Sequence, residues 1–165
     1  MNGDPLLYDY FNQLAIEFEY IEHPAAPTIE IAKQYWGDHD ATHCKNIFLR
    51  NHKGNQHYLI LLPCDFNVNI RQLELKLKQG KLSFSSPERL FRYLKLTPGS
   101  VTPYGLIHDA ESHVIVYLDQ SLAKAERLSF HPNINTASVI VANVDFMRFL
   151  ESTKNRYEFV DLAVD

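Results

Sequence analysis

Three short stretches of this sequence place polar side chains next to rigid backbone, and their residue types are the ones that could do chemistry. They are the pair Lys45-Asn46, the loop Gly99-Ser100-Val101-Thr102-Pro103, and residues 130–136, which include His131 and Asn133. A lysine can hold an anion, a histidine can move a proton, and a loop bounded by Gly and Pro can present backbone groups in fixed positions. Each stretch alone also has an ordinary structural interpretation.

Lys45 lies in a segment that predicts a β-strand, because residues 43–50 are rich in apolar side chains and precede a turn-like 51–55. Alternation along a strand puts Lys45, Ile47 and Leu49 on one face. A lysine in line with two aliphatic residues either extends to solvent at the strand end or lies in a cavity that favours a cation.

Two other chemistries receive little support from these residues. Cys44 follows His43 on the strand and faces away from Lys45, so we do not expect a lysine-activated thiolate. His39 and His43 are four residues apart, but Asp38-His39-Asp40 resembles a turn and HExxH is absent, so we expect no metal site.

The remaining elements alternate between helices and strands without a strict βαβ repeat, which predicts a mixed α/β fold with a largely antiparallel sheet flanked by helices. The expected helices are 5–18 (capped by Asp4), 28–37, 69–79, 86–94 and 144–150 (capped by Asn143). The expected strands are 43–50, 57–63 in a hairpin with it, 81–84, 106–107, 114–118, 138–141 and 157–164. We expect one domain over residues 1–165.

Composition and charge narrow the classes of function. With 45% hydrophobic and 22% charged residues, the chain is typical of globular proteins, and no signal peptide or membrane span is visible. The two cysteines suggest free thiols in the cytoplasm.

The net charge of -4 argues against general nucleic-acid binding, but the charge is distributed unevenly along the sequence. Residues 1–40 hold eight acids and one base, and residues 71–95 hold seven bases and two acids. The latter are either a solvated helix face or a patch that faces phosphate.

Four blocks in order make the chain resemble the prolyl-tRNA editing proteins of the YbaK/ProX type, in particular the freestanding PrdX branch. The blocks are Cys44-Lys45-Asn46-Ile47-Phe48-Leu49, residues 81–90, residues 96–106 and Phe130-His131-Pro132-Asn133. Ile134 stands where a Thr is expected and Ser85 where Ala is common; neither is one of the expected catalytic groups. The resemblance covers nearly the whole chain.

The resemblance implies a barrel-like mixed α/β domain that needs no cofactor and hydrolyses the ester of alanine on tRNA(Pro). It implies catalytic roles for Lys45 and His131, and water activation largely by a hydroxyl of the terminal ribose. Substrate contacts are expected from Asn46, Asn133 and the loop Gly99, Ser100, Val101, Thr102 and Pro103. The basic residues Arg71, Lys76, Lys78 and Lys81 are expected to contact tRNA, and prolyl-tRNA synthetase or an elongation factor is a transient partner. The alternatives are a deacylase for Cys- or Ser-tRNA and a non-catalytic module that binds a tRNA end.

Overall fold

The computed structural model describes residues 1–25, 34 and 40–163. The helices are α1 (Pro5–Gln13), α3 (Ile70–Leu77), α4 (Pro87–Leu94) and α5 (Asn143–Thr153), with two 3-10 helices, η1 (Pro103–His108) and η2 (Gln120–Lys124). The strands are β1 (Glu19–Glu22), β2 (Thr42–Asn51), β3 (His57–Pro63), β4 (Leu82–Phe84), β5 (Ile115–Asp119), β6 (Arg127–Phe130), β7 (Ala137–Ala142) and β8 (Tyr157–Val160). No helix in the described ranges is long and apolar enough to cross a membrane.

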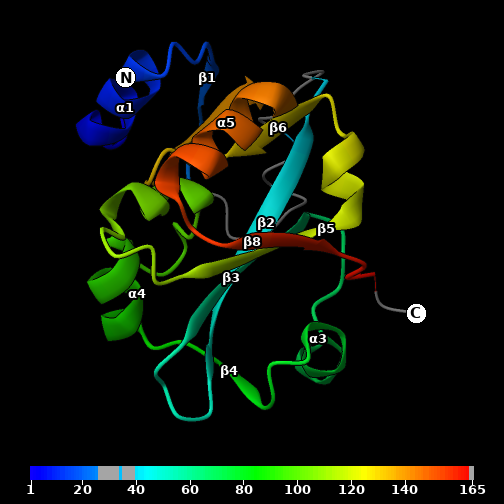
Figure 1. Ribbon diagram of the computed structural model, residues 1–165. Helices are drawn as coiled ribbons and strands as arrows, with labels where there is room; N and C mark the ends of the chain where they lie inside the picture. Colours follow the sequence, from blue (N-terminus) through cyan, green and yellow to red (C-terminus); the bar gives the residue numbers. More distant parts are fainter. Residues whose placement is uncertain (26–33, 35–39, 164–165) are drawn as a thin grey trace.

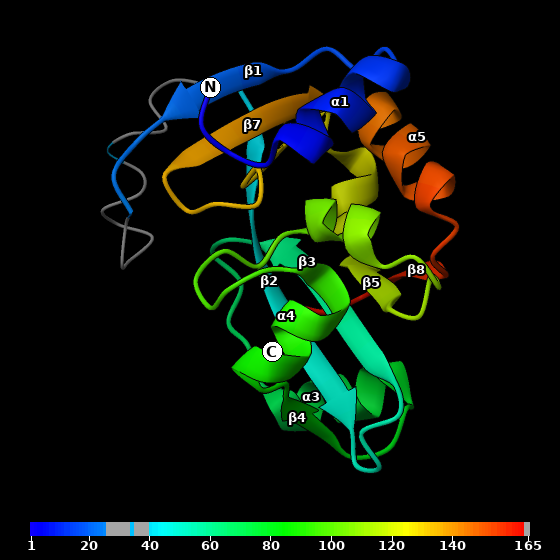
Figure 2. The ribbon, with the colours of Figure 1, turned by 90° about the vertical axis from the view of Figure 1, so that its left-hand side faces the viewer.

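The eight strands form one mixed sheet in the order β1-β7-β6-β2-β3-β5-β8, with β4 also paired to β2. The long strand β2 connects two halves of the molecule (Figure 1). Its beginning pairs in parallel with β6, and its remainder pairs antiparallel with β3, as the expected hairpin. Helices α1 and α5 lie with the half that holds β1, β6 and β7, while α3 and α4 lie with the other (Figure 2). The predicted mixed α/β fold, a mixed sheet flanked by helices, is confirmed.

The sheet is buried on both faces around the β2–β3 hairpin, because two separate hydrophobic clusters cover it. Phe48, Leu59 and Leu61 belong to a large cluster that also receives α1, α4 and α5. The alternating residues Leu49, Ile60 and Leu62 belong to a smaller cluster closed by Leu73 and Leu77 of α3. Strand β3 is therefore a continuous apolar run, as expected for a strand with no solvent-facing side.

Three local expectations are corrected. Leu106 and Ile107 belong to η1 and not to a strand, since Thr102 caps that helix and Pro103 occupies its first turn. Strand β6 was not expected from the sequence. Helix α5 has no side-chain cap: the Asn143 amide donates instead to the carbonyls of Leu122 and Ala125, at 2.8 and 2.6 Å. The expected helix 28–37 lies outside the described residues, apart from residue 34. His39, which the sequence analysis compared with His43 as a metal ligand, also lies outside them.

Candidate active site

The parallel pairing of β2 with β6 brings Lys45 and His131 to the same face of the sheet. His43 is in register with Ser129; Lys45 follows two residues later on β2, and His131 follows two residues later, directly after the end of β6. The residues between, Cys44 and Phe130, pack against the large hydrophobic cluster on the opposite face. Because side chains alternate between faces along an extended chain, Lys45 and His131 both lie on the face of the sheet that points away from that cluster.

The His131 imidazole is held in one tautomer. Its Nδ1 lies 2.8 Å from the carbonyl oxygen of Ala137, which accepts only a hydrogen bond, so Nδ1 carries the proton. Nε2 is left with a lone pair and has no hydrogen-bond partner among the described residues. Burial lowers the pKa of His131, and His23 lowers it further, although the Ala137 carbonyl partly opposes both effects. His131 is therefore a neutral base at pH 7.

Lys45 is half-buried, and its ammonium makes no ion pair or hydrogen bond with any residue that the structure describes. Cys44 on the opposite face is different, because burial raises the pKa of its thiol, so it stays protonated. The prediction that Cys44 faces away from Lys45 is confirmed. Within residues 1–25, 34 and 40–163, no group of three His, Cys, Asp or Glu side chains is arranged to hold a metal ion.

A second histidine lies beside His131 and was not singled out from the sequence. The ring centroids of His23 and His131 are 6.0 Å apart. His23 is buried; its Nδ1 lies 2.9 Å from the Pro24 carbonyl and its Nε2 lies 2.9 Å from Ser138 Oγ. In its neutral form His23 therefore donates from Nδ1 to the Pro24 carbonyl and accepts a hydrogen bond from the Ser138 hydroxyl on Nε2. The one available signal was that the sequence His23-Pro24 predicts an extended backbone.

The loop 99–103 is fastened to both strands of the site. Gly99 has a φ of 89°, a left-handed backbone conformation that favours glycine. The Asn46 amide donates to the Val101 carbonyl at 3.0 Å, and the Thr102 hydroxyl donates to the His131 carbonyl at 2.8 Å. Asn46 lies on the face opposite to Lys45, so the structure gives it contact with the loop and not with Lys45. Ser100, Thr102 and Pro103 are buried.

Asn133 is held by the N-terminal segment. It has a left-handed backbone with φ of 66°, and its amide donates to Asp4 Oδ2 at 3.1 Å. The Asp4 backbone N–H donates to the Pro132 carbonyl at 3.2 Å, and His108 Nε2 lies 2.7 Å from the same carboxylate. The loop that carries His131 is thus tied to the first turn of α1.

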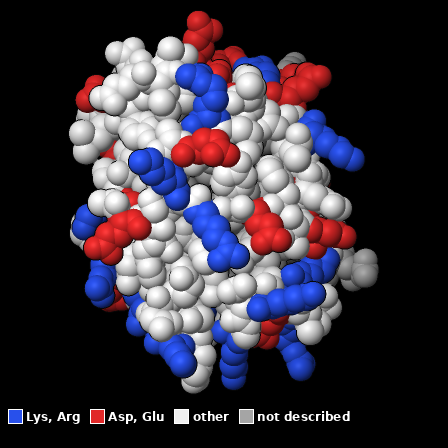
Figure 3. Space-filling view, viewed as in Figure 1, with Lys and Arg blue, Asp and Glu red and all other residues white. Residues whose placement is uncertain are grey.

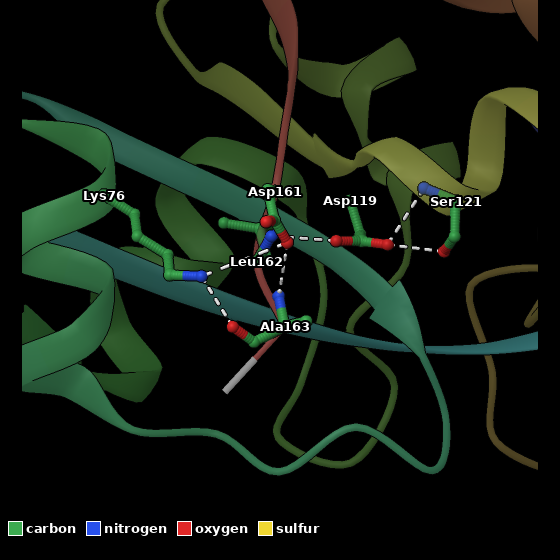
Figure 4. A network of polar contacts seen from close by, with 6 residues as sticks. All are labelled: Lys76, Asp119, Ser121, Asp161, Leu162 and Ala163. Carbon is green, nitrogen blue, oxygen red and sulfur yellow. Dashed lines mark hydrogen bonds and ion pairs between the residues drawn. The ribbon is translucent and has the colours of Figure 1, made fainter. Parts of the chain in front are cut away.

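The four basic residues predicted to contact tRNA have different surroundings. Arg71, Lys78 and Lys81 are exposed. Lys76 instead holds the C-terminal segment: its Nζ donates to the Ala163 carbonyl at 2.5 Å and lies 4.0 Å from Asp161 (Figure 4). The neighbouring Asp119 accepts from the Leu162 backbone at 2.8 Å.

The chain is similar to known proteins along most of its length. Residues 23–149 match the family model described as the aminoacyl-tRNA editing domain. The chain is 34% identical to the prolyl-tRNA editing protein ProX of Acetoanaerobium sticklandii over 151 residues, 92% of each chain. It is 31% identical to the prolyl-tRNA synthetase associated domain-containing protein 1 of Mus musculus, over 85% of each chain.

Solved structures show the same fold. The crystal structure of a candidate trans-editing enzyme for prolyl tRNA synthetase superposes with a TM-score of 0.69 at 19% identity, covering 97% of this chain and 99% of that one. With the family match, the protein belongs to the aminoacyl-tRNA editing family of deacylases.

Proposed function

We propose that the protein hydrolyses the ester of alanine on mischarged tRNA(Pro), acting in trans in the cytoplasm after the tRNA has left prolyl-tRNA synthetase. The observation that carries this proposal is the shared face of Lys45 and His131, where a half-buried cation and a neutral histidine Nε2 both lack partners among the described residues. The names of the relatives, which refer to prolyl-tRNA editing and prolyl-tRNA synthetase, support the choice of tRNA.

The proposed chemistry is direct attack by water on the ester carbonyl. The water oxygen forms the new bond to the carbonyl carbon, the bond from that carbon to the ribose oxygen breaks, and a proton ends on the ribose oxygen. Lys45 stabilises the negative charge of the carbonyl oxygen or of the terminal phosphate. His131 Nε2 accepts a hydrogen bond from the attacking water or from the ribose hydroxyl that orients it. The products are alanine and uncharged tRNA.

Such an enzyme is needed because a pocket that accepts proline discriminates poorly against the smaller alanine. A synthetase pocket made for proline excludes the smaller alanine poorly, because one methylene is worth only about 1–3 kcal/mol in a hydrophobic pocket. A second site that admits alanine and excludes proline restores accuracy. We expect the loop 99–103 to line this site, and its attachment to β2 and to the His131 segment supports this, because Asn46 donates to the Val101 carbonyl and the Thr102 hydroxyl donates to the His131 carbonyl.

Single-turnover deacylation with tRNA(Pro) charged in turn with alanine, proline, serine and cysteine tests the proposal. We expect rapid hydrolysis of Ala-tRNA(Pro) and a rate for Pro-tRNA(Pro) close to spontaneous hydrolysis. Comparable rates for alanine and proline contradict editing by size. A preference for serine or cysteine leaves the deacylase but changes its substrate. Binding without hydrolysis of any ester would indicate a tRNA-end binding module.

The predicted contacts of Arg71, Lys76, Lys78 and Lys81 with the tRNA acceptor stem stay a prediction. Three of these side chains are exposed and can contact phosphate, whereas Lys76 already donates a hydrogen bond to the backbone carbonyl of Ala163. We expect the weakest effect on binding from replacing Lys76. A transient contact with prolyl-tRNA synthetase or an elongation factor would deliver the substrate, and pull-down of the charged tRNA complex tests it.

A further inference from the structure

Helix α4 has a buried side and an exposed side of unusual composition. Ser86 caps the helix and accepts from the Arg89 backbone, and Pro87 occupies its first position. Leu90 and Leu94 are buried in the large hydrophobic cluster. The opposite side exposes 54% of Phe91. An exposed aromatic ring beside cations offers a face on which a nucleic-acid base can stack.

A cation lies over the Phe91 ring. Lys95 Nζ lies 5.1 Å from the ring centroid, and the exposed Arg92 is the next residue along the helix, with its guanidinium 5.3 Å from the centroid of the Tyr93 ring. Residues 87–95 hold three bases, Arg89, Arg92 and Lys95, against the single acid Glu88. Arg89 is bonded to the Gly54 carbonyl and to His57, so Arg92 and Lys95 are the cations available on the exposed side. Figure 3 shows Lys and Arg side chains over the end of the molecule that contains α4, α3 and the β2–β3 turn. An anionic partner with flat aromatic groups matches this surface better than an apolar peptide does.

The exposed side of α4 leads directly into the substrate loop. Lys95 ends the helix in a left-handed conformation, Leu96 is buried, and Thr97, Pro98 and Gly99 are exposed before the loop turns inward at Ser100. Figure 2 shows α4 beneath this loop, on the side of the molecule that faces the viewer. A strand of nucleic acid that reaches the site past Gly99 would therefore cross the α4 surface.

The other basic surface, on α3, is less suited to a single strand. Glu74 accepts from the Leu82 backbone, and Lys76 is held beside Asp161, so acids accompany the bases there. Phe84 of β4 is 58% exposed, but none of the described residues places a cation at its ring as Lys95 does at Phe91.

We propose that Phe91, Arg92 and Lys95 form a docking surface for the single-stranded 3′ end of the aminoacylated RNA, with a base stacked on Phe91 and phosphates near the two cations. The proposal rests on the proposed function, because the RNA end is what the site must receive. Base–aromatic stacking tolerates any base, and phosphate contacts with Lys and Arg make binding depend on salt. This surface positions the strand and takes no part in the chemistry.

Binding of uncharged RNA tests the docking surface independently of hydrolysis. The probes are a tRNA(Pro) acceptor minihelix with its single-stranded 3′ end and the same minihelix made blunt, with affinities from fluorescence anisotropy. We expect Phe91→Ala to weaken binding of the complete minihelix by roughly 5- to 150-fold, the range of one lost stack, with little effect on the blunt one. Arg92→Glu with Lys95→Glu should also reduce the salt dependence. Phe84→Ala is the matched control and should bind as the unaltered protein does.

The pair Lys78→Glu and Lys81→Glu introduces the same change of charge on the α3 side. If it acts on RNA, it should weaken both minihelices equally. The α4 proposal is overturned if Phe91→Ala binds both minihelices normally, or if its loss is as large on the blunt minihelix. At saturating Ala-tRNA(Pro), the Phe91→Ala variant should keep the single-turnover rate of the unaltered protein. Absence of hydrolysis by the unaltered protein would instead refute the proposed function and leave the binding result standing.

Discussion

Lys45 is the residue on which the proposed chemistry depends most. Its ammonium lies on the face shared with His131 and has no partner among the described residues, so the proposed mechanism gives it an anionic ligand. Removing a half-buried cation without a partner should not destabilise the sheet, whereas removing one electrostatic contact to a developing oxyanion costs about 10²–10³ in rate.

We therefore expect Lys45→Ala to lose at least about 10²-fold in single-turnover deacylation of Ala-tRNA(Pro) while its melting temperature is kept. Lys45→Arg should also fail, because a planar guanidinium does not replace a compact ammonium. Lys53→Ala, at an exposed lysine in the β2–β3 turn, is the control. Near-normal hydrolysis by a folded Lys45→Ala protein would show that Lys45 only extends its ammonium to solvent and takes no part in the reaction.

The neutral state of His131 predicts a pH profile. Because the pKa of His131 is lowered, Nε2 keeps its lone pair at pH values below the ordinary histidine pKa of about 6.5. The enzyme-catalysed rate, after subtraction of spontaneous hydrolysis, should be flat from pH 8 to about 6.5 and fall only at lower pH. A rate that falls already between pH 8 and 7 would show that His131 is not the group that must be neutral.

The elements were predictable where local patterns agree with packing, and less so elsewhere. The hairpin of β2 and β3 follows from two apolar runs around the turn at 51–55, and β3 matches its expected bounds. Strand β6 was missed because it is four residues long, begins with Arg127, and gains its order from β2 and β7. The shared face of Lys45 and His131 depends on that strand, so the sequence analysis named both residues without showing that they lie on one face.

The same limit explains why the His23–Ser138 contact was missed. These residues are 115 positions apart and meet because β1 pairs antiparallel with β7. No local pattern in either segment reports that pairing. Asn133 illustrates a different limit, since its predicted substrate contact came from resemblance, while its amide contact with Asp4 is visible only in the structure.

Asp4 connects helix α1 to the His131 loop, and its two roles can be separated. As the N-cap it accepts from the Leu6 backbone at 3.0 Å, and its other oxygen receives His108 and Asn133. Burial raises the pKa of Asp4, but the hydrogen bonds from His108 and Asn133 outweigh this and lower it below the usual value. The connection is therefore complete at neutral pH and is lost as pH falls through the lowered pKa.

Asp4→Ser should keep the helix cap but is too short to hold His108 and Asn133. We expect it to lower the deacylation rate more than the melting temperature, since it loosens the loop that carries His131. Asp4→Ala should also lose about 0.5–2 kcal/mol of stability with the cap. Asp9→Ser, an exposed acid on the same helix, is the control for both measurements. An unchanged rate in Asp4→Ser would show that the loop keeps its position without Asp4.

At the level of the whole molecule, a buried histidine cluster joins the β2–β3 hairpin to helix α4. His57 is fully buried; its Nδ1 lies 2.9 Å from His113 Nε2, and its Nε2 lies 3.1 Å from Arg89 Nη1. The Tyr93 ring packs on both histidines, with centroids 4.2 and 4.6 Å away, and Arg89 also donates to the Gly54 carbonyl. Since Arg89 can only donate, His57 must accept on Nε2 and donate from Nδ1, which requires a neutral ring.

This cluster makes folding stability depend on pH. Burial, followed by the nearby His113 and Arg89, lowers the pKa of His57 to about 4, against 6.5 in the unfolded chain. Below pH 6.5 the unfolded chain therefore binds a proton that the folded protein refuses, so the free energy of unfolding falls as the pH drops from 6.5 toward 4. Above pH 6.5 this contribution is constant. Melting temperatures measured across pH 4–8 should show the decline. His52→Gln changes an exposed histidine in the turn between β2 and β3 and should leave this decline unchanged. His57→Gln should flatten the decline, even though this variant is less stable at pH 7. If the slope between pH 6.5 and 4 persists in His57→Gln, the acid sensitivity arises from other groups.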